Sequence, residues 1–95
     1  MIDSINLATT KVKQVHGNIV SDMDGEKVMF SITNGKYYNL GDVGGEIWDQ
    51  MKEPVTIQTI IDNMLSLYEV EKELCTEHVL SFLTMLTEEE LIVRI

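Results

Sequence analysis

The run from Gly35 to Trp48, GKYYNLGDVGGEIW, places the strongest constraint on how this chain folds. Its first residues are typical of a strand, and a glycine-marked turn separates them from a short segment with helical spacing. Ile47 and Trp48 supply a large apolar pair for the buried face of that helix. A strand that leads directly into a helix predicts a domain of mixed α and β structure.

Three β-rich runs up to Leu40 predict an antiparallel meander. Their sequences are NIVSDM, EKVMFSI and KYYNL, and the dipeptides Asp24-Gly25 and Asn34-Gly35 separate them. Dipeptides of this kind between β-rich runs are strong hairpin signals. A further alternating segment over residues 11–16 predicts a short edge strand before the meander.

Side-chain alternation in the meander favours three-residue hairpin loops over two-residue turns. If a glycine in the left-handed region closes each loop, Val20 faces Val28, which in turn faces Leu40. Phe30 then faces Tyr38, so that the large apolar side chains share one face, as a half-buried sheet requires. The opposite face is expected to carry Lys27, Met29, Ser31, Tyr37 and Asn39.

Helical periodicity dominates the rest of the chain. Asp42 is expected to cap a first helix that reaches Lys52. Thr56 is expected to cap a second helix, whose apolar residues recur at helical spacing up to Tyr68. A third helix is predicted over residues 72–87, and the final LIVRI predicts a brief strand.

The expected fold class is therefore α+β, with a three-stranded antiparallel meander followed by three helices. The polar, irregular residues 1–10 predict a flexible N-terminus. Residues 11–95 are expected to form a single domain, because a chain of 95 residues holds one hydrophobic core.

The predicted third helix is more apolar than a surface helix requires. Its apolar residues cover about half of the helix circumference at 100° per residue, although a stripe somewhat over 100° wide is enough to meet a core. A second contact within the fold explains the excess, and so does an exposed apolar face that awaits a partner. The residues concerned are Leu74, Cys75, His78, Val79, Phe82, Leu83, Met85 and Leu86.

Composition narrows the functional classes. The formal net charge of −9 disfavours nucleic-acid binding, which draws most of its affinity from lysine and arginine on phosphates. No apolar run approaches the roughly 18 residues of a membrane span. Cys75 is the single cysteine, which excludes an internal disulfide and fits a cytoplasmic location. We therefore expect no nucleic-acid partner and no membrane partner.

The residue types of catalytic and metal sites do not assemble into a known pattern. Cys75 and His78 share one helix face, but structural zinc needs four ligands and His16 is the only other candidate. The same pair lacks the third group that orients a nucleophilic cysteine. The GxxGG run over residues 41–45 lacks the P-loop lysine and the spacing of a dinucleotide fingerprint. We expect no enzyme activity, no catalytic residue, no metal and no cofactor.

The order of the predicted elements and several short motifs resemble the PqqD-like family. The motifs are GKYYNL followed by Gly and Ile-Trp, Pro54-Val55-Thr56, Tyr68-x-Val70, and Val79-x-x-Phe82-Leu83-x-x-Leu86. They extend over roughly residues 19–92. Members of this family are the peptide-recognition domains of ribosomal natural-product biosynthesis, called RiPP recognition elements. The resemblance implies a compact, winged-helix-turn-helix-like fold.

The resemblance also implies that the chain binds the leader segment of a ribosomally made precursor peptide. In this family the leader adds as a strand to the free edge of the third strand, and its side chains enter a groove against the third helix. Both a free strand edge and an apolar helix are expected here from the residues themselves. The implied peptide-binding residues are Lys36, Tyr37, Tyr38, Asn39, Leu40, Cys75, His78, Val79 and Phe82.

Several functions fit this resemblance. A short stand-alone chain is most similar to a lasso-peptide leader-binding protein, whose partner is a separate cysteine-protease leader peptidase or another modifying enzyme. It is also similar to peptide chaperones that serve radical-SAM enzymes. A winged-helix DNA-binding regulator is a structural alternative, but it needs a basic recognition helix where this chain has Glu73 and Glu77. Because Lys72 is the only basic residue of the predicted third helix, we expect an apolar or aromatic leader anchor.

Overall fold

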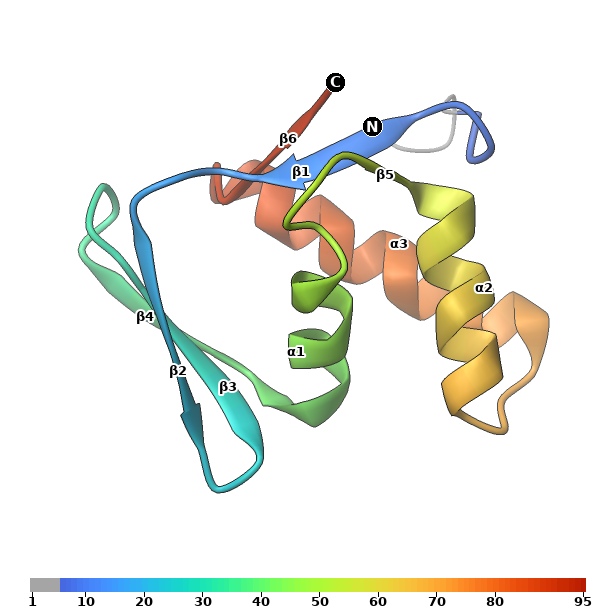
Figure 1. The fold of residues 1–95 in the computed structure, drawn as a ribbon, viewed down its shortest axis with the longest axis horizontal. Coiled ribbons are helices and arrows are strands. Elements are labelled where there is room, and N and C mark those ends of the chain that lie inside the picture. The colour runs from blue at the N-terminus through green and yellow to red at the C-terminus, as the bar shows by residue number, and fades with distance from the viewer. Residues whose placement is uncertain (1–5) are drawn as a thin grey trace.

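Two small antiparallel sheets and three helices form the structure, a computed structural model that describes residues 6–95 (Figure 1). The α+β fold class, with a β-meander followed by three helices, is confirmed. In chain order the elements are β1 (Lys11–Gln14), β2 (Asn18–Met23), β3 (Glu26–Ser31), β4 (Lys36–Leu40), α1 (Gly41–Asp49), β5 (Val55–Thr56), α2 (Ile57–Leu67), α3 (Lys72–Glu88) and β6 (Ile92–Arg94).

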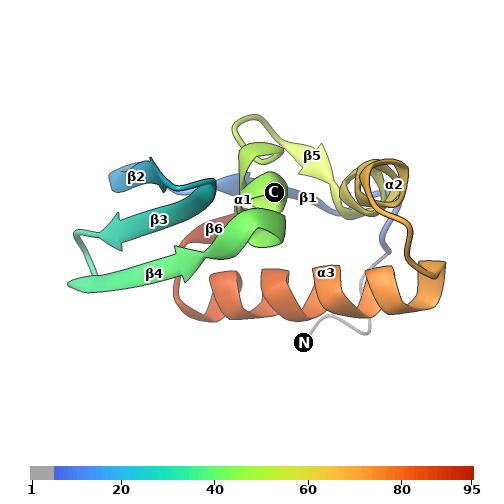
Figure 2. The same ribbon diagram turned by 90° about the horizontal axis from the view of Figure 1, so that it is seen from below.

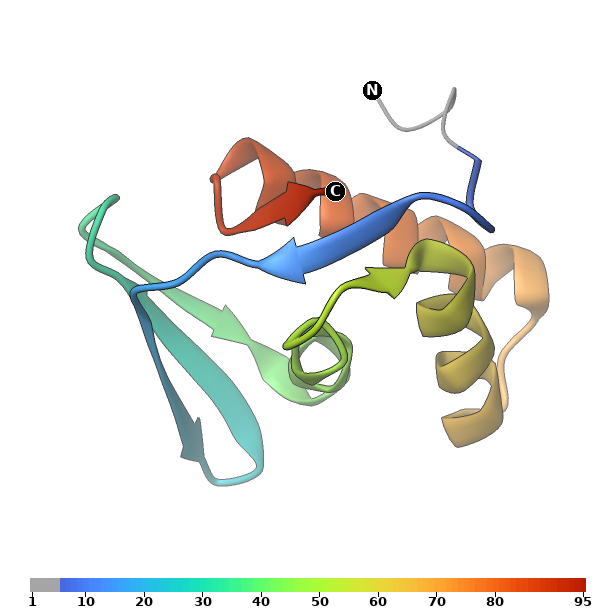
Figure 3. The same cartoon turned by 45° about the horizontal axis from the view of Figure 1, so that its top comes forward.

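The second sheet, in the order β5–β1–β6, was not expected from the sequence. The prediction that the segment containing β1 is an edge strand is wrong, because β1 lies between two antiparallel neighbours (Figure 3). Val12 pairs with Val55 on one side and Arg94 on the other. The brief C-terminal strand is confirmed as β6. This sheet ties together segments from both ends of the chain.

The meander is confirmed in the order β2–β3–β4, but its predicted register is wrong by one residue in both hairpins. Ser21 pairs with Val28 across the first hairpin, and Met29 pairs with Tyr38 across the second. The first hairpin has a two-residue turn, in which Asp24 (φ 55°) and Gly25 (φ 83°) both adopt positive φ. Two positive φ values at these positions define a type I′ turn, which matches the twist of the flanking strands.

Because of the register shift, the side chains of β3 that were expected on the inner face lie on the outer face, and the reverse. Met29 is fully buried and Ser31 is almost so, whereas Val28 and Phe30 lie on the outer face. The outward placement of Tyr37 and Asn39 on β4 is confirmed. On the outer face the rings of Phe30 and Tyr37 contact each other, with centroids 4.7 Å apart.

The helices begin and end close to their expected limits, with one incorrect cap. Thr56 caps α2 as predicted, because its Oγ1 accepts a hydrogen bond from the backbone N–H of Thr59 at 3.1 Å. The first helix instead begins at Gly41, with no side-chain cap and with Asp42 in its first turn, and it ends at Asp49 rather than at Lys52. The chain therefore passes from β4 into α1 without an intervening loop.

Helix α3 runs beneath α1 and crosses beneath α2, which Figure 2 shows nearly end-on. Four of its side chains belong to the core, namely Cys75, Val79, Leu83 and Leu86. Leu80, Phe82 and Met85 are partly buried against the same core, while Leu74 remains 43% exposed. Contacts within the fold thus account for most of the apolar excess that the sequence indicated.

Candidate functional site

Strand β4 is the edge of its sheet. It pairs with β3 on one side, and within residues 6–95 no strand pairs with its other side. Strand β2 forms the opposite edge, but it projects away from the helices, whereas β4 continues directly into α1 (Figure 1). The β4 edge therefore joins an open row of backbone groups to the helical half of the molecule.

The ladder of the sheet identifies which backbone groups of β4 are free. In a two-residue hairpin the flanking pair Met23–Glu26 exchanges both hydrogen bonds, and such pairs alternate along an antiparallel ladder. The backbone N–H and C=O groups of Phe30 therefore bond to β2, whereas those of Met29 bond to Tyr38 on β4. On β4 the N–H and C=O groups of Tyr37 and Asn39 then point to the open edge.

An apolar pocket of about 190 Å³ lies between the three helices. Helix α1 contributes Val43 and Ile47, and the C-terminal end of α2 contributes Met64 and its capping residue Tyr68. Val70 belongs to the loop that follows, and α3 contributes the remaining residues. The complete lining consists of Val43, Ile47, Met64, Tyr68, Val70, Cys75, His78 and Val79. Because α1 follows β4 without a loop, the pocket has a fixed position relative to the free strand edge.

Polar side chains fasten the β3–β4 hairpin to the end of α3. The Tyr38 hydroxyl donates to Glu89 Oε1 at 2.6 Å, and Asn34 Nδ2 donates to the Glu89 carbonyl oxygen at 2.8 Å. Lys36 Nζ lies 3.6 Å from the same carboxylate. The hydrogen bond from Tyr38 and then the charge of Lys36 lower the pKa of Glu89, so this carboxylate is ionised at neutral pH.

At the other end of β4, helix α1 packs against α3 through an apolar contact. A Cβ atom at Gly44 would lie 3.0 Å from the Phe82 ring and 3.5 Å from Leu40 Cβ, so the ring packs closely on this part of α1. Phe82 does not line the apolar pocket but lies one helical turn beyond His78 and Val79. The Glu89 contacts thus hold the β3–β4 hairpin to the end of α3, and the Phe82 contact holds the helix that follows β4 to the middle of α3.

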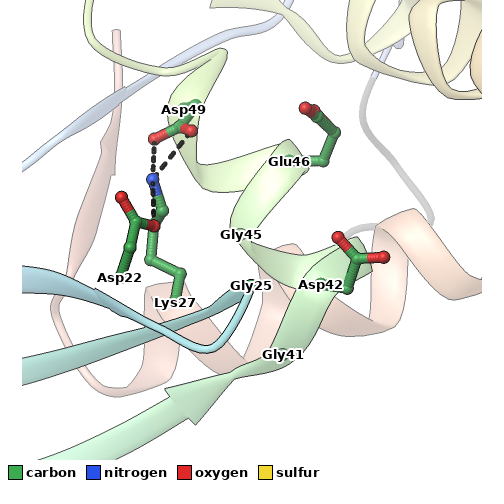
Figure 4. A pocket seen from close by; sticks show the side chains of 8 residues that line it. All are labelled: Asp22, Gly25, Lys27, Gly41, Asp42, Gly45, Glu46 and Asp49. Atoms are coloured by element: carbon green, nitrogen blue, oxygen red, sulfur yellow. Dashed lines mark hydrogen bonds and ion pairs between the residues drawn. The ribbon is translucent and has the colours of Figure 1, made fainter.

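A polar cleft on the other side of α1 is occupied by an internal ion pair (Figure 4). Lys27 Nζ donates to both carboxylate oxygens of Asp49, at 2.9 and 2.8 Å, and lies 3.4 Å from Asp22. The hydrogen bond to Asp49 raises the pKa of Lys27. This arrangement joins β3 to α1 and explains how an inward-facing lysine is accommodated.

The predicted site residues fall into two groups. Lys36, Tyr37, Tyr38, Asn39 and Leu40 all lie on β4, where Tyr38 and Leu40 face inward. Cys75, His78 and Val79 lie together in the apolar pocket, and Phe82 lies beside it. The sequence did not indicate the pocket residues of α1 and α2, or Glu89, because their proximity depends on how the helices pack.

The pocket cysteine is a buried core residue. Cys75 is 5% exposed, and burial raises the pKa of its thiol, which disfavours the reactive thiolate. Within the described part of the chain no three His, Cys, Asp or Glu residues come together in a way that could hold a metal ion. None of its helices is long and apolar enough to cross a membrane.

Comparisons with known proteins place this geometry in a family. Residues 26–92 match the family of coenzyme PQQ synthesis protein D (PqqD), and the chain therefore belongs to the PqqD-like family. A solved structure, "TbiB1 in Complex with the TbiA(beta) Leader Peptide", matches with a TM-score of 0.76 and 26% identity. The match covers 84% of this chain and 93% of TbiB1. No curated protein matches the sequence significantly.

Proposed function

We propose that this protein binds the leader segment of a ribosomally made precursor peptide and delivers it to a separate processing enzyme. The observation that carries the proposal is the open β4 edge, in a chain whose fold matches a protein solved with a leader peptide. A leader that adds as a strand bonds to the backbone groups of Tyr37 and Asn39. Its inner-face side chains would lie on the same side of the sheet as Tyr38 and Leu40, the side on which Tyr38 reaches Glu89 at the end of α3.

The peptide contacts divide into backbone and side-chain parts. Lys36, Tyr37, Tyr38, Asn39 and Leu40 supply the backbone edge, which provides affinity with little dependence on sequence. The pocket residues Cys75, His78 and Val79, with Phe82 beside them, supply the apolar surface that selects a leader side chain. A binding role without catalysis fits this division, because burial raises the pKa of Cys75, the one thiol among these residues, and so disfavours its reactive thiolate.

The direction of the Asn39 N–H provides the test. Asn39→Pro removes this donor without disturbing the bonds of β4 to β3, and proline is tolerated at such edge positions. Losing one main-chain hydrogen bond is expected to weaken binding by about 2- to 10-fold. Fluorescence polarisation with a labelled synthetic leader, taken from the precursor encoded beside this chain, measures the change.

Asn39→Ala is the matched control for Asn39→Pro. It keeps the backbone N–H but, like proline, loses the side-chain bond in which Asn39 Oδ1 accepts from the Gly41 N–H. Equal leader affinity of the proline and alanine variants would exclude strand addition at β4. The enzyme partner is identified separately, by the rate at which a cysteine-protease leader peptidase removes the leader with and without this protein. A radical-SAM enzyme is the alternative partner, and the rate at which it modifies the precursor peptide with and without this protein tests it.

A further inference from the structure

Strand β2 presents a second open edge, on the side of β3 away from β4 (Figure 2). In the part of the chain that the structure describes, β2 pairs only with β3, through six consecutive residue pairs without a bulge. Because Met23 and Glu26 flank the two-residue turn, they exchange both hydrogen bonds, and every second residue of β2 then bonds to β3. The N–H and C=O groups that point to the open edge are therefore those of Asn18, Val20 and Asp22.

The β2 edge lacks most of the features that protect an exposed strand from pairing. Natural edge strands are often very short, or they contain lysine, proline or a bulge. Strand β2 has six residues and none of these devices, and its Ile19 and Met23 side chains are 55% and 60% exposed. Its one charged residue is Asp22, on the inner face opposite Lys27. Any strand that adds to this edge must therefore accommodate the Asp22 carboxylate.

A basic cleft of about 150 Å³ lies beside the inner face of β2. Asn18 and Val20 line it from β2, and the basic side chains of Lys13, His16 and Lys52 line it from the neighbouring segments. No carboxylate is among its lining residues, and within the described chain none of the three basic residues forms an ion pair. In a chain with a net charge of −9, this cleft concentrates uncompensated positive charge next to an open strand edge.

A second copy of this chain fits the β2 edge in one symmetric register. If two β2 strands pair antiparallel about a twofold axis at Val20, Asn18 of each copy lies opposite Asp22 of the other. In this register every free N–H and C=O group of the edge finds a partner. Directly opposed residues share a face of the sheet, so Asp22 of one copy lies beside Asn18 and hence at the basic cleft of the other copy. The two Asp22 carboxylates do not face each other.

We propose that this protein forms a homodimer through antiparallel pairing of its β2 strands, with Asp22 of each copy at the basic cleft of the other. The occupant of the edge is a second copy because one segment supplies both the carboxylate and the cleft that receives it. Asp22 is available for this contact, since its side chain is 75% exposed and Lys27 donates its short hydrogen bonds to Asp49. The net charge of −9 opposes association at long range, but salt screens that repulsion beyond about 8 Å at physiological ionic strength.

The dimer is separate from leader binding. Pairing at β2 joins the two three-stranded meanders into one sheet, with the β4 strands at its two outer ends. Both β4 edges remain free, so the dimer is expected to bind one leader per chain.

Sedimentation equilibrium at about 0.15 M sodium chloride tests the dimer. The average mass of the unaltered protein is expected to rise with concentration, from the 10.8 kDa of one chain toward twice that value. Val20→Pro removes the N–H donor at the twofold axis from both copies and leaves the bonds of β2 to β3 intact. The loss of both hydrogen bonds is expected to raise the dimer Kd by about 10- to 100-fold relative to Val20→Ala, which keeps the N–H.

Charge variants of Asn18 test the register without changing the backbone. Asn18→Lys places a lysine opposite Asp22 of the other copy and is expected to lower the dimer Kd by about 2- to 30-fold. Asn18→Asp places two carboxylates opposite each other and is expected to raise the Kd by a similar factor. Both variants lose the hydrogen bond from Asn18 Nδ2 to the Val15 carbonyl oxygen, so that loss alone would shift both in the same direction.

Several outcomes would overturn the dimer. A mass that stays at one chain at every concentration would exclude it, and shifts of equal sign for Asn18→Lys and Asn18→Asp would exclude the proposed register. Dissociation of the dimer by Asn39→Pro, or by the labelled leader, would place the contact at β4 instead of β2. Opposite shifts for the two Asn18 variants, with the dimer retained in Asn39→Pro, would support pairing at β2.

Discussion

At Gly45 α1 approaches β3 closely, and Gly45→Ala tests that packing. A Cβ atom at this position would lie 2.8 Å from Lys27 Cβ. Two carbon atoms without a covalent bond pack at about 3.5–4.0 Å, so the helix and strand must separate by roughly 1 Å. Lys27 Cβ is attached directly to the β3 backbone and cannot move alone. The strain therefore falls on the contact between the sheet and α1.

The expected stability change is the difference between two opposing effects. Overpacking a well-filled contact costs about 1–3 kcal/mol. Replacing glycine by alanine within a helix recovers about 1 kcal/mol of helix propensity. Because the clash involves backbone-attached atoms, we expect a cost in the upper part of that range, about 2–3 kcal/mol, and hence a net loss of about 1–2 kcal/mol in the free energy of unfolding. In a domain of this size each kcal/mol lowers the Tm by about 4–8 °C.

Urea denaturation monitored by Trp48 fluorescence measures this loss. Trp48 is the single tryptophan, is 3% exposed, and lies on α1 itself. Gly44→Ala provides the comparison, since its new Cβ would meet the outer atoms of the Phe82 ring at 3.0–3.1 Å, and that ring can shift. We expect Gly45→Ala to be the less stable of the two. A Gly45→Ala midpoint at or above that of the unaltered protein would refute the argument.

Two further predictions concern the sheet. Met29→Ala is expected to cost about 2–5 kcal/mol in urea denaturation because Met29 is fully buried, and a larger cost for Val28→Ala would contradict the observed register. Tyr38→Phe is expected to destabilise the protein at neutral pH, whereas Tyr37→Phe, which alters an exposed hydroxyl, should not. Because the folded-state pKa of Glu89 lies below its ordinary 4.5, the Tyr38→Phe deficit should narrow as acid protonates Glu89, and thermal melts against pH measure this.

The arrangement of elements was predictable because periodicity is a local property. Helical spacing identified all three helices, and the alternation within β4 correctly placed Tyr38 inward and Tyr37 outward. The same principle failed on β3, where Val28, Met29 and Phe30 form a continuous apolar run without alternation. In such a run the turn decides the register, and Asp24 permits a type I′ turn by adopting positive φ.

The inward face of β3 depends on contacts that the sequence does not reveal. Lys27 is tolerated there because Asp49, 22 residues away, accepts two hydrogen bonds from its amine. Ser31 is tolerated because its hydroxyl accepts the N–H of Asn34. Polar residues that find partners through tertiary packing override a pattern based on hydrophobicity. The small β5–β1–β6 sheet was missed for a related reason, since its strands are only 2–4 residues long and pair across most of the chain.

The junction between β4 and α1 determines how the two parts of the proposed site act together. Leu40 is the last residue of β4 and Gly41 the first of α1, with a φ of 73° that turns the chain sharply. The free backbone of Asn39 and the pocket residue Val43 are thus four residues apart on one continuous, ordered segment. A leader bound along β4 would consequently reach the pocket at a fixed number of residues from its strand-pairing part. Recognition would then depend on the spacing within the leader as well as on the apolar residue that enters the pocket.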